Sequence, residues 1–263
     1  MDQPKIVPIS SVIKENESIK TITFPWNKKT IPGQFFMIWI PSIDEIPMSV
    51  SMIEDDKKSI TFKVVGDATH ALYQLKKEDK IGIRGPYGNG FKIKGHYDLF
   101  IGGGTGIAMM GPAVKQCLHE HDSVDIILGA KTKDELFFIK QLEDMGARVH
   151  PTTDDGSFGY KGYASNLARE LIQKQKIENI YTCGPEPMMK SLLDLCNQHH
   201  IHLQASVERY MKCAVGLCGQ CCIGEGLRVC VEGPIFTGTQ LQQIKDFGVY
   251  KRNASGKKTF FQK

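Results

Sequence analysis

The sequence predicts an N-terminal antiparallel β-barrel, then a doubly wound α/β domain, then a small C-terminal metal-binding segment. Three observations carry this prediction. Short strands and turn residues fill the first 95 residues, strands and helices alternate over residues 96–207, and five cysteines lie within residues 213–230. The first pattern is typical of small barrels. The second is typical of a parallel sheet covered by helices on both faces.

The composition is that of a globular protein. Of 263 residues, 41% are hydrophobic and 24% are charged, both near the usual averages. A net charge of +4 is too small for a nucleic-acid binder that relies on neutralising phosphates. No apolar run reaches the roughly 18 residues of a membrane span, and no signal-like apolar core is recognisable. We therefore expect a cytoplasmic protein with no nucleic-acid or membrane partner.

The barrel prediction depends on strands with turn residues between them. Alternating or continuous apolar runs predict strands over 19–24, 35–40 and 59–65. The separating turns are Pro32-Gly33, residues 54–57 and Gly85-Pro86.

From residue 97 the pattern changes to strand and helix in alternation. Strands are predicted over 98–101, 123–128, 148–150 and 179–182. Helices are predicted over 107–119, 133–142, 163–173 and 185–197, the last with a proline in its first turn. This spacing indicates a doubly wound sheet.

The cysteines suggest a metal centre, because a reducing cytosol disfavours disulfides. Cys213, Cys218 and Cys221 have the spacing C-x4-C-x2-C, and Cys230 follows after eight residues. This is the plant-type spacing for a [2Fe–2S] cluster held by four thiolates. Gly216 and Gly219 stand between the ligands, where a tight loop needs them.

Two alternatives remain open for this segment. Structural zinc sites usually combine two CxxC pairs, and only one is present here, so the spacing favours iron–sulfur over zinc. Cys222 could replace Cys221 as a ligand, but the x2 spacing favours Cys221.

Two glycine-containing turns follow predicted strands. Gly102-Gly103-Gly104-Thr105-Gly106 joins a strand to a helix, and so does Cys183-Gly184-Pro185. Such turns let a pyrophosphate approach the backbone at a helix N-terminus. A tight structural connection is the alternative. Both turns are expected at one crevice, because ligands bind outside the carboxyl ends of parallel strands.

The order of these motifs resembles the ferredoxin–NAD(P) reductase superfamily over nearly the whole chain. More narrowly, it resembles the family of iron–sulfur flavoprotein subunits that serve NAD-linked dihydroorotate dehydrogenases. The resemblance rests on the two turns, the four cysteines, the segment 47–51 and Gly85-Pro86-Tyr87-Gly88-Asn89-Gly90-Phe91. It implies a ferredoxin reductase-like fold with FAD, a [2Fe–2S] cluster and NAD as cofactors.

The resemblance also implies site residues. Ser49 would lie near the reactive edge of FAD and Cys183 near the nicotinamide, both as catalytic residues. Ile46 stands where the family usually has an arginine for the FAD phosphates, so charge there must come from elsewhere, such as Lys63 or backbone donors. The other FAD contacts implied are Pro47, Met48, Thr61, Phe62, Lys63, Ala68 and Thr69, with Thr69 contributing its hydroxyl. The NAD contacts implied are Gly103, Gly104, Thr105, Gly106, Cys183, Gly184 and Pro185.

The implied function is that of an oxidoreductase subunit in pyrimidine biosynthesis. Electrons from dihydroorotate would leave the FMN of a separate catalytic subunit and reach NAD⁺ through the cluster and FAD of this chain. A hetero-oligomer, a heterotetramer in this family, is therefore expected. Tyr210, Met211, Val215 and Leu217 are the expected docking residues, unless they pack beneath the loop. Two other functions remain open: a diaphorase-like gamma subunit of a sulfur reductase or hydrogenase, and a zinc-stabilised interaction module.

The sequence thus divides into four expected parts. They are a FAD-binding barrel at 1–95, an NAD-binding domain at 96–207, a cluster segment at 208–236 and a polar tail at 237–263. The tail carries Lys251, Arg252, Lys257, Lys258 and Lys263 and is expected to be a solvated end.

Overall fold

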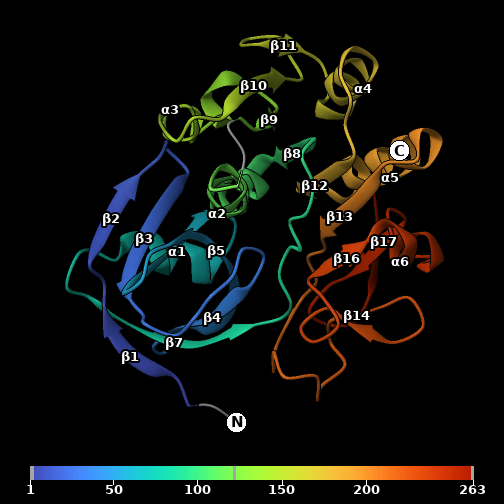
Figure 1. Cartoon of the computed structure of the whole chain (residues 1–263). Helices are drawn as coiled ribbons and strands as arrows, with labels where there is room; N and C mark the ends of the chain where they lie inside the picture. Colours follow the sequence, from blue (N-terminus) through green and yellow to red (C-terminus); the bar gives the residue numbers. More distant parts are fainter. Residues whose placement is uncertain (1–2, 121–122, 262–263) are drawn as a thin grey trace.

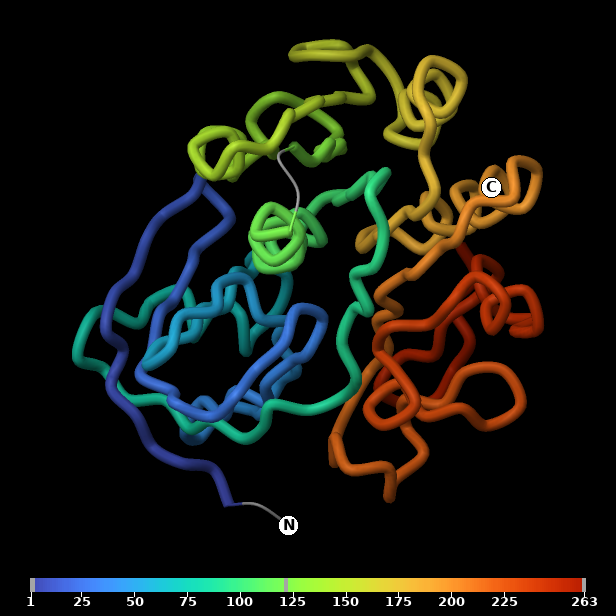
Figure 2. Tube along the Cα trace, in the orientation of Figure 1, coloured from blue at the N-terminus to red at the C-terminus, as the bar shows by residue number. Residues whose placement is uncertain are grey.

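The computed structural model describes residues 3–120 and 123–261. The chain forms a curled sheet, an α/β unit beside it, and a C-terminal segment that packs against both (Figure 1). The trace in Figure 2 shows that the last third of the chain returns along the flank of the α/β unit. Lys263 lies outside the described residues.

The N-terminal unit is a seven-stranded antiparallel sheet in the order β1-β7-β4-β5-β6-β3-β2. Its strands are β1 (Lys5–Pro8), β2 (Ser11–Lys14), β3 (Ile19–Pro25), β4 (Phe35–Ile40), β5 (Asp44–Ile53), β6 (Lys57–Lys63) and β7 (Lys80–Tyr87). The sheet curls around apolar side chains that include Phe24, Phe36 and Ile60. The expected barrel is confirmed as a curled half-barrel.

The three predicted barrel strands are present, and four more join them. β1 and β2 lie at the edges and are largely exposed, so they lack the apolar pattern that predicts a strand. Asp67–Gln74 forms helix α1, which the sequence analysis does not predict. Its buried Leu72 packs into the barrel core, and this tertiary contact stabilises a helix of only eight residues.

The second sheet has the order β11-β10-β9-β8-β12-β13-β16. Its strands are β8 (Asp98–Gly103), β9 (Asp125–Ala130), β10 (Arg148–Thr153), β11 (Tyr160–Lys161), β12 (Asn179–Cys183), β13 (His202–Ser206) and β16 (Ile235–Thr237). All neighbours pair in parallel except β16, which runs antiparallel to β13. The strand order reverses between β8 and β12, so the topological switch point lies there.

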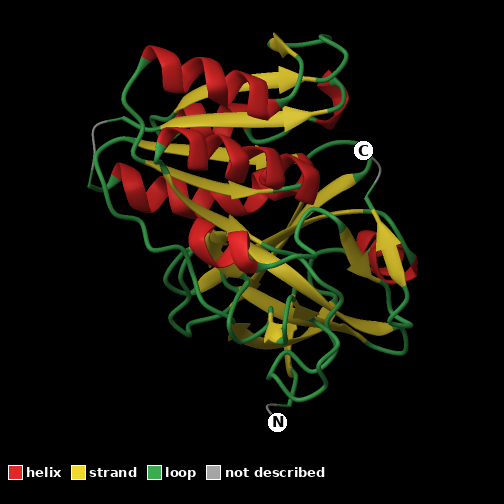
Figure 3. Cartoon of the chain, turned by 90° about the vertical axis from the view of Figure 1, so that its right-hand side faces the viewer, coloured by secondary structure: helices red, strands yellow, loops and turns green. Residues whose placement is uncertain are grey.

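Helices cover both faces of this sheet (Figure 3). They are α2 (Ile107–Leu118), α3 (Ile139–Asp144), α4 (Ala164–Lys174) and α5 (Glu186–His199), with short 3₁₀ turns η1 (Gly104–Gly106) and η2 (Lys133–Glu135). The predicted helix over 133–142 is wrong in its extent. The helical conformation is interrupted between η2 and α3. Phe138, which precedes α3, has a left-handed φ of 66°, and a right-handed helix cannot include such a residue.

The C-terminal part forms further elements beyond the predicted loop. They are β14 (Cys222–Ile223), β15 (Leu227–Arg228), β16, α6 (Gly238–Gln243), β17 (Tyr250–Arg252) and β18 (Lys258–Phe260). The expected solvated tail is therefore wrong for residues 238–247, whereas Lys251, Arg252, Lys257 and Lys258 are exposed as expected. Leu241, Ile244 and Phe247 are buried against the core beneath α5, which fixes the segment in place.

No helix within the described ranges combines the length and the apolar character needed to cross a membrane.

Candidate functional site

A cavity of about 560 Å³ lies where the curled sheet meets the switch point of the α/β sheet. The barrel contributes Ser49 from β5 and Phe62 from β6, and the α/β unit contributes Thr105 and Cys183. The two glycine turns therefore do reach one crevice, and that crevice is shared with the barrel.

The cavity gathers ten of the predicted cofactor residues. Those lining it are Pro47, Met48, Ser49, Thr61, Phe62, Lys63, Thr69, Thr105, Gly106 and Cys183. Those absent from the lining are Ile46, Ala68, Gly103, Gly104, Gly184 and Pro185. Ile46 and Ala68 pack against the barrel core instead.

The two glycine turns lie against each other. A Cβ on Gly106 would stand 2.3 Å from the carbonyl oxygen of Cys183, and one on Gly184 would stand 2.9 Å from the Cα of Gly103. Both distances are too short for any side chain. These glycines are required for the contact between the turns, whereas Gly104, with φ of +54° and open space beside it, is free to face a ligand.

Two of the predicted FAD contacts have partners within the chain. The Thr69 hydroxyl accepts from the amides of Val65 (2.9 Å) and Gly66 (3.0 Å) and donates to the Gly66 carbonyl (2.9 Å). These bonds use both lone pairs and the proton, so Thr69 would have to exchange one of them to bind FAD through its hydroxyl, and that contact stays a prediction. Lys63 Nζ forms an ion pair with Glu135 Oε1 at 2.8 Å, which links the barrel to η2.

Sequence reasoning did not assign the other lining residues to this site. Those with polar, charged or thioether side chains that come from the C-terminal third of the chain are Ser206, Glu208, Arg209, Met211 and Lys251. Ser206 ends β13 and pairs with Cys183 of β12, and the next three follow that strand. Identifying β13 as the next parallel strand would have placed them at the same sheet edge. No local signal points to Lys251, which the hairpin of β17 and β18 brings to the cavity.

Two ionisable side chains that line the cavity, Cys183 and Glu208, have raised pKa values. Burial raises the pKa of the Cys183 thiol well above its ordinary value, and the charge of Glu208 adds to this, while a hydrogen bond with Ser206 opposes it. Cys183 is therefore a neutral thiol near pH 7. The Glu208 side chain is open to the cavity but surrounded by protein elsewhere, so burial raises its pKa, against the effects of Lys251 and Arg209.

The cysteine loop brings its thiols together in pairs. Cys213 lies beside Cys218, and Cys221 contacts Cys230. The negative charge of Cys213 also contributes to raising the pKa of Cys230. Cys221 and Cys230 are buried, Cys213 is half-buried and Cys218 is exposed.

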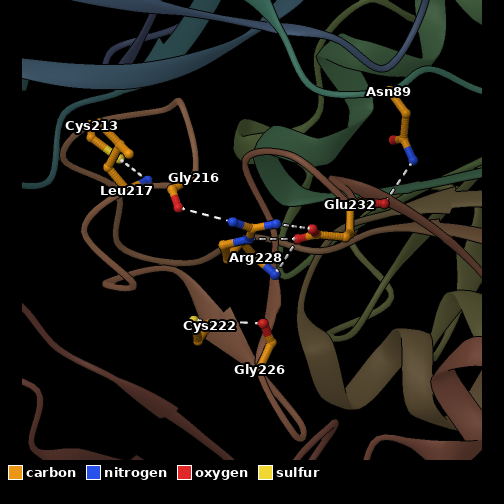
Figure 4. A network of polar contacts seen from close by, with 8 residues as sticks. All are labelled: Asn89, Cys213, Gly216, Leu217, Cys222, Gly226, Arg228 and Glu232. Carbon is orange, nitrogen blue, oxygen red and sulfur yellow. Dashed lines mark hydrogen bonds and ion pairs between the residues drawn. The ribbon is translucent and has the colours of Figure 1, made fainter.

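Backbone amides point at the first of these sulfurs. The N–H groups of Leu217 and Cys218 lie 3.3 and 3.4 Å from Cys213 Sγ. Figure 4 shows the first of these two contacts. Burial raises the pKa of Cys213, but these amides and that of Val215 outweigh it and bring the pKa to about 6. The loop thus favours a thiolate at Cys213.

The thiols fit a two-iron cluster better than a single ion. In a [2Fe–2S] centre each iron takes two thiolates, which is the paired arrangement seen here. Structural zinc instead needs all four ligands around one point. The Sγ of Cys222 lies 3.9 Å from the Gly226 carbonyl oxygen (Figure 4), which favours Cys221 as the ligand.

The cysteine loop is joined to both the barrel and the cavity. Arg84 of β7 forms a bidentate ion pair with Glu45 and also donates to the carbonyl of Cys213 at 3.4 Å. Asn89 donates to the carbonyls of Glu232 and Ile235, both at 3.0 Å. Met211 lines the cavity only two residues before Cys213.

A larger cavity of about 1090 Å³ lies elsewhere, lined by Asn179, His202 and other residues at the amino ends of β12 and β13. None of the predicted site residues lines it. Because ligands of such sheets bind at the carboxyl ends of strands, we place the site in the smaller cavity.

Comparisons with known proteins agree with this geometry. Residues 208–242 match the family model for the iron–sulfur cluster binding domain of dihydroorotate dehydrogenase B, and residues 100–194 match the oxidoreductase NAD-binding domain.

Full-length relatives extend the match. A probable dihydroorotate dehydrogenase B (NAD⁺) electron transfer subunit of Methanocaldococcus jannaschii is 42% identical over 99% of this chain and 100% of its own length. Another, from Methanothermobacter thermautotrophicus, is 40% identical over 98% of both chains. A solved structure of an NADH-dependent reduced ferredoxin–NADP oxidoreductase, described in work on flavin-based electron bifurcation, superposes with a TM-score of 0.81 at 28% identity and covers 93% of this chain and 91% of its own.

With the cavity, the paired thiols and these full-length matches together, the chain belongs to the family of electron transfer subunits of dihydroorotate dehydrogenase B.

Proposed function

We propose that this chain carries electrons from a dihydroorotate-oxidising catalytic subunit to NAD⁺, through a [2Fe–2S] cluster and FAD. The observation that carries the proposal is the continuity of the site. One cavity is lined by the barrel and the α/β unit, and Met211 on its wall leads directly into the cysteine loop at Cys213. The family membership is consistent with all three cofactors.

The three cofactors have complementary chemistry. FAD exchanges hydride with NAD and single electrons with an iron–sulfur cluster, so it is the necessary intermediary between them. The side chains of this chain bind and orient. Met48 and Phe62 offer apolar surface in the cavity, the Ser49 hydroxyl offers a hydrogen bond, and Cys183 presents an uncharged thiol.

The missing arginine at position 46 leaves the FAD phosphates without their usual cation. Lys63 is engaged with Glu135. Lys251 lines the cavity, where its charge acts on Glu208, and it forms no ion pair within 4 Å in the part of the chain that the structure describes. We therefore assign Lys251, together with backbone amides, to the phosphates in place of Lys63.

The cysteine loop is the proposed docking face for the catalytic subunit and its FMN. Leu217 is 74% exposed and Tyr210 is 39% exposed, whereas Met211 is buried and Val215 is half-buried. Of the four expected docking residues, the first two are therefore available to a partner. Leu217 precedes Cys218, the most exposed of the four cluster cysteines, and an exposed apolar side chain at this place suits contact with another subunit.

The proposed functions divide along the chain as the sequence predicts. We propose FAD binding by residues 1–95, NAD binding by 96–207 and cluster binding by 208–236, with the C-terminal part at 237–263 closing the cavity through Lys251. All eight cysteines are free thiols. Reduced thiols are usual in a reducing compartment, which supports a cytoplasmic location. The role in pyrimidine biosynthesis is supported by the family to which the chain belongs.

Reconstitution tests this function. The isolated chain should contain flavin, iron and sulfide and should oxidise NADH with ferricyanide, yet it should be inactive on dihydroorotate. Adding the catalytic subunit from the same source should give NAD⁺-dependent oxidation of dihydroorotate. Leu217→Asp should weaken that coupled activity, and Leu217→Met is the matched control that keeps the apolar contact.

Each contrary result has a distinct meaning. If both subunits are loaded with their cofactors but mixing gives no complex and no coupled activity, the dihydroorotate function is overturned. Activity would then be sought with sulfur reductase or hydrogenase partners. A colourless zinc protein would overturn both redox functions.

A further inference from the structure

The peptide group between Gly216 and Leu217 has hydrogen-bond partners on both sides. Its N–H points toward a cysteine ligand, and its carbonyl points toward Arg228. Arg228 Nη1 donates to the Gly216 carbonyl at 3.0 Å. The N–H of the same peptide, on Leu217, points at Cys213 Sγ at 3.3 Å (Figure 4). A trans peptide is planar, with its C=O and N–H directed oppositely. Fixing the carbonyl therefore fixes the direction of the amide.

The guanidinium that holds this carbonyl is itself held. The Glu232 carboxylate accepts from the backbone N–H of Arg228 at 2.6 Å and from its Nε at 3.2 Å, and it also accepts from Nη2. The Glu232 carbonyl accepts from Asn89 of the barrel at 3.0 Å. The chain of contacts in Figure 4 thus runs from the barrel to the first cysteine ligand.

The backbone at Gly216 is adapted to this contact. Its φ is +78°, and a Cβ there would stand 2.8 Å from Val231 Cγ2 and 3.2 Å from Arg228 Nη1. A left-handed φ favours glycine, so the residue type at position 216 suits both the turn and the close approach of Arg228.

We infer that Arg228, oriented by Glu232, is a positioning residue that tunes the reduction potential of the cluster by aiming the Leu217 amide at Cys213. Hydrogen bonds to ligand sulfur stabilise the extra negative charge of the reduced cluster, so they raise the potential. The inference rests on the proposed function, since it requires the cluster on these cysteines.

The test separates hydrogen bonding from charge. The double variant Arg228→Met, Glu232→Gln removes one positive and one negative side chain, so the net charge beside the cluster stays the same. We expect its reduction equilibrium constant to fall about tenfold, which is 59 mV for one electron, in an EPR-monitored redox titration. Double-resonance spectra of the reduced cluster should also lose the exchangeable amide proton coupling assigned to Leu217.

Two controls define the result. Lys212→Met removes an exposed positive charge next to Cys213 without touching the turn, and it should leave the amide coupling in place. Flavin content and NADH oxidation by ferricyanide should be unchanged in the double variant, because neither residue lines the cavity.

The outcomes are distinguishable. An unchanged potential with an unchanged amide coupling in the double variant would overturn the inference and leave the proposed function intact. If the double variant loses its cluster, the reduction potential of Arg228→Lys tests the inference instead. Lysine keeps the positive charge but lacks the planar guanidinium that contacts Glu232 and Gly216 together. We expect the reduction potential to fall by less than in the double variant, and a wild-type potential would overturn the inference. Absence of iron and sulfide from the wild-type chain would overturn the proposed function itself.

Discussion

Adjacent cysteines in the ligand loop have different surroundings. Cys221 is buried and contacts Cys230, whereas Cys222 turns toward the Gly226 carbonyl. We therefore expect Cys221→Ser to lose the cluster and Cys222→Ser to retain it, because losing a ligand opens a coordination position. Iron and sulfide analysis with low-temperature EPR measures this. An intact cluster in Cys221→Ser combined with loss in Cys222→Ser would reverse the assignment.

Asp125, at the start of β9, is a second site with a distinctive environment. Burial raises the pKa of its carboxyl, but hydrogen bonds from His150 (2.7 Å) and Arg148 (3.0 Å) outweigh this and hold the pKa well below the ordinary value. A depressed pKa in the folded state stabilises the protein above the unfolded-state pKa of about 4, and this stabilisation is lost as the pH falls below it.

Asp125→Asn should therefore lower the free energy of unfolding at pH 7 by about 1.5–3 kcal/mol, the usual range for hydrogen bonds to a charged group. The difference from wild type should shrink toward pH 3. Urea unfolding at both pH values measures it. A pH-independent difference would show that the ionised carboxylate is not the cause. Asp144→Asn, on an exposed surface pair, is the control.

At the scale of elements, a buried ion pair fixes the start of α5. Glu186 lies in its first turn, accepts from Arg209 at 2.5 and 3.0 Å, and accepts from the amide of Gly248 at 2.7 Å. Both side chains are almost fully buried. The pair connects α5 to the segment after β13 and to the C-terminal hairpin that carries Lys251.

Arg209→Met should destabilise the protein by about 3–5 kcal/mol, because it leaves a buried carboxylate without its partner. The double variant with Glu186→Gln should recover much of this loss, since no charge is then left unpaired. Denaturant unfolding of the two single variants and the double variant forms the cycle. Equal destabilisation by the double variant and Arg209→Met would contradict this explanation. Lys190→Met, at an exposed pair on the same helix, is the control.

At the scale of the whole molecule, the barrel touches the cysteine segment through the turn after β7. Gly88 has φ of +74°, and a Cβ there would stand 2.4 Å from Pro234 Cδ and 2.9 Å from the Gly233 carbonyl oxygen. Its neighbour Asn89 bonds to the same segment. The position of the cluster relative to the flavin cavity thus depends on this close backbone approach.

Gly88→Ala should push the two units apart and reduce cluster retention, with a lower melting temperature. Gly111→Ala is the matched control, because its Cβ would meet only Ser51 O at an ordinary 3.6 Å. Inside a helix this change should stabilise by up to about 1 kcal/mol. Iron content after gel filtration and thermal unfolding test both variants. Full retention of iron by Gly88→Ala would show that the contact is dispensable.

The sequence by itself determined the features that are local along the chain. Ligand spacing at Cys213–Cys230 is a property of one loop, and the strand and helix periods of residues 98–130 and 179–199 are fixed by neighbouring residues. Prediction from the sequence was incomplete where tertiary packing determines the element. Helix α1 depends on the packing of Leu72 into the barrel core. The helix predicted over 133–142 is interrupted at Phe138.

Only the tertiary structure decided what surrounds the site. Lys251 and Ser49 are some two hundred positions apart in the sequence, yet they line one cavity because the C-terminal hairpin returns to the barrel. The ion pair of Lys63 with Glu135 and the hydrogen bond from Arg228 to the Gly216 carbonyl likewise depend on the tertiary structure, because each joins residues from different elements. Local sequence patterns specify which cofactors can bind, because the ligand residues and the turns lie within short segments of the chain. The packing of two sheets and a returning chain specifies how those cofactors are positioned and tuned.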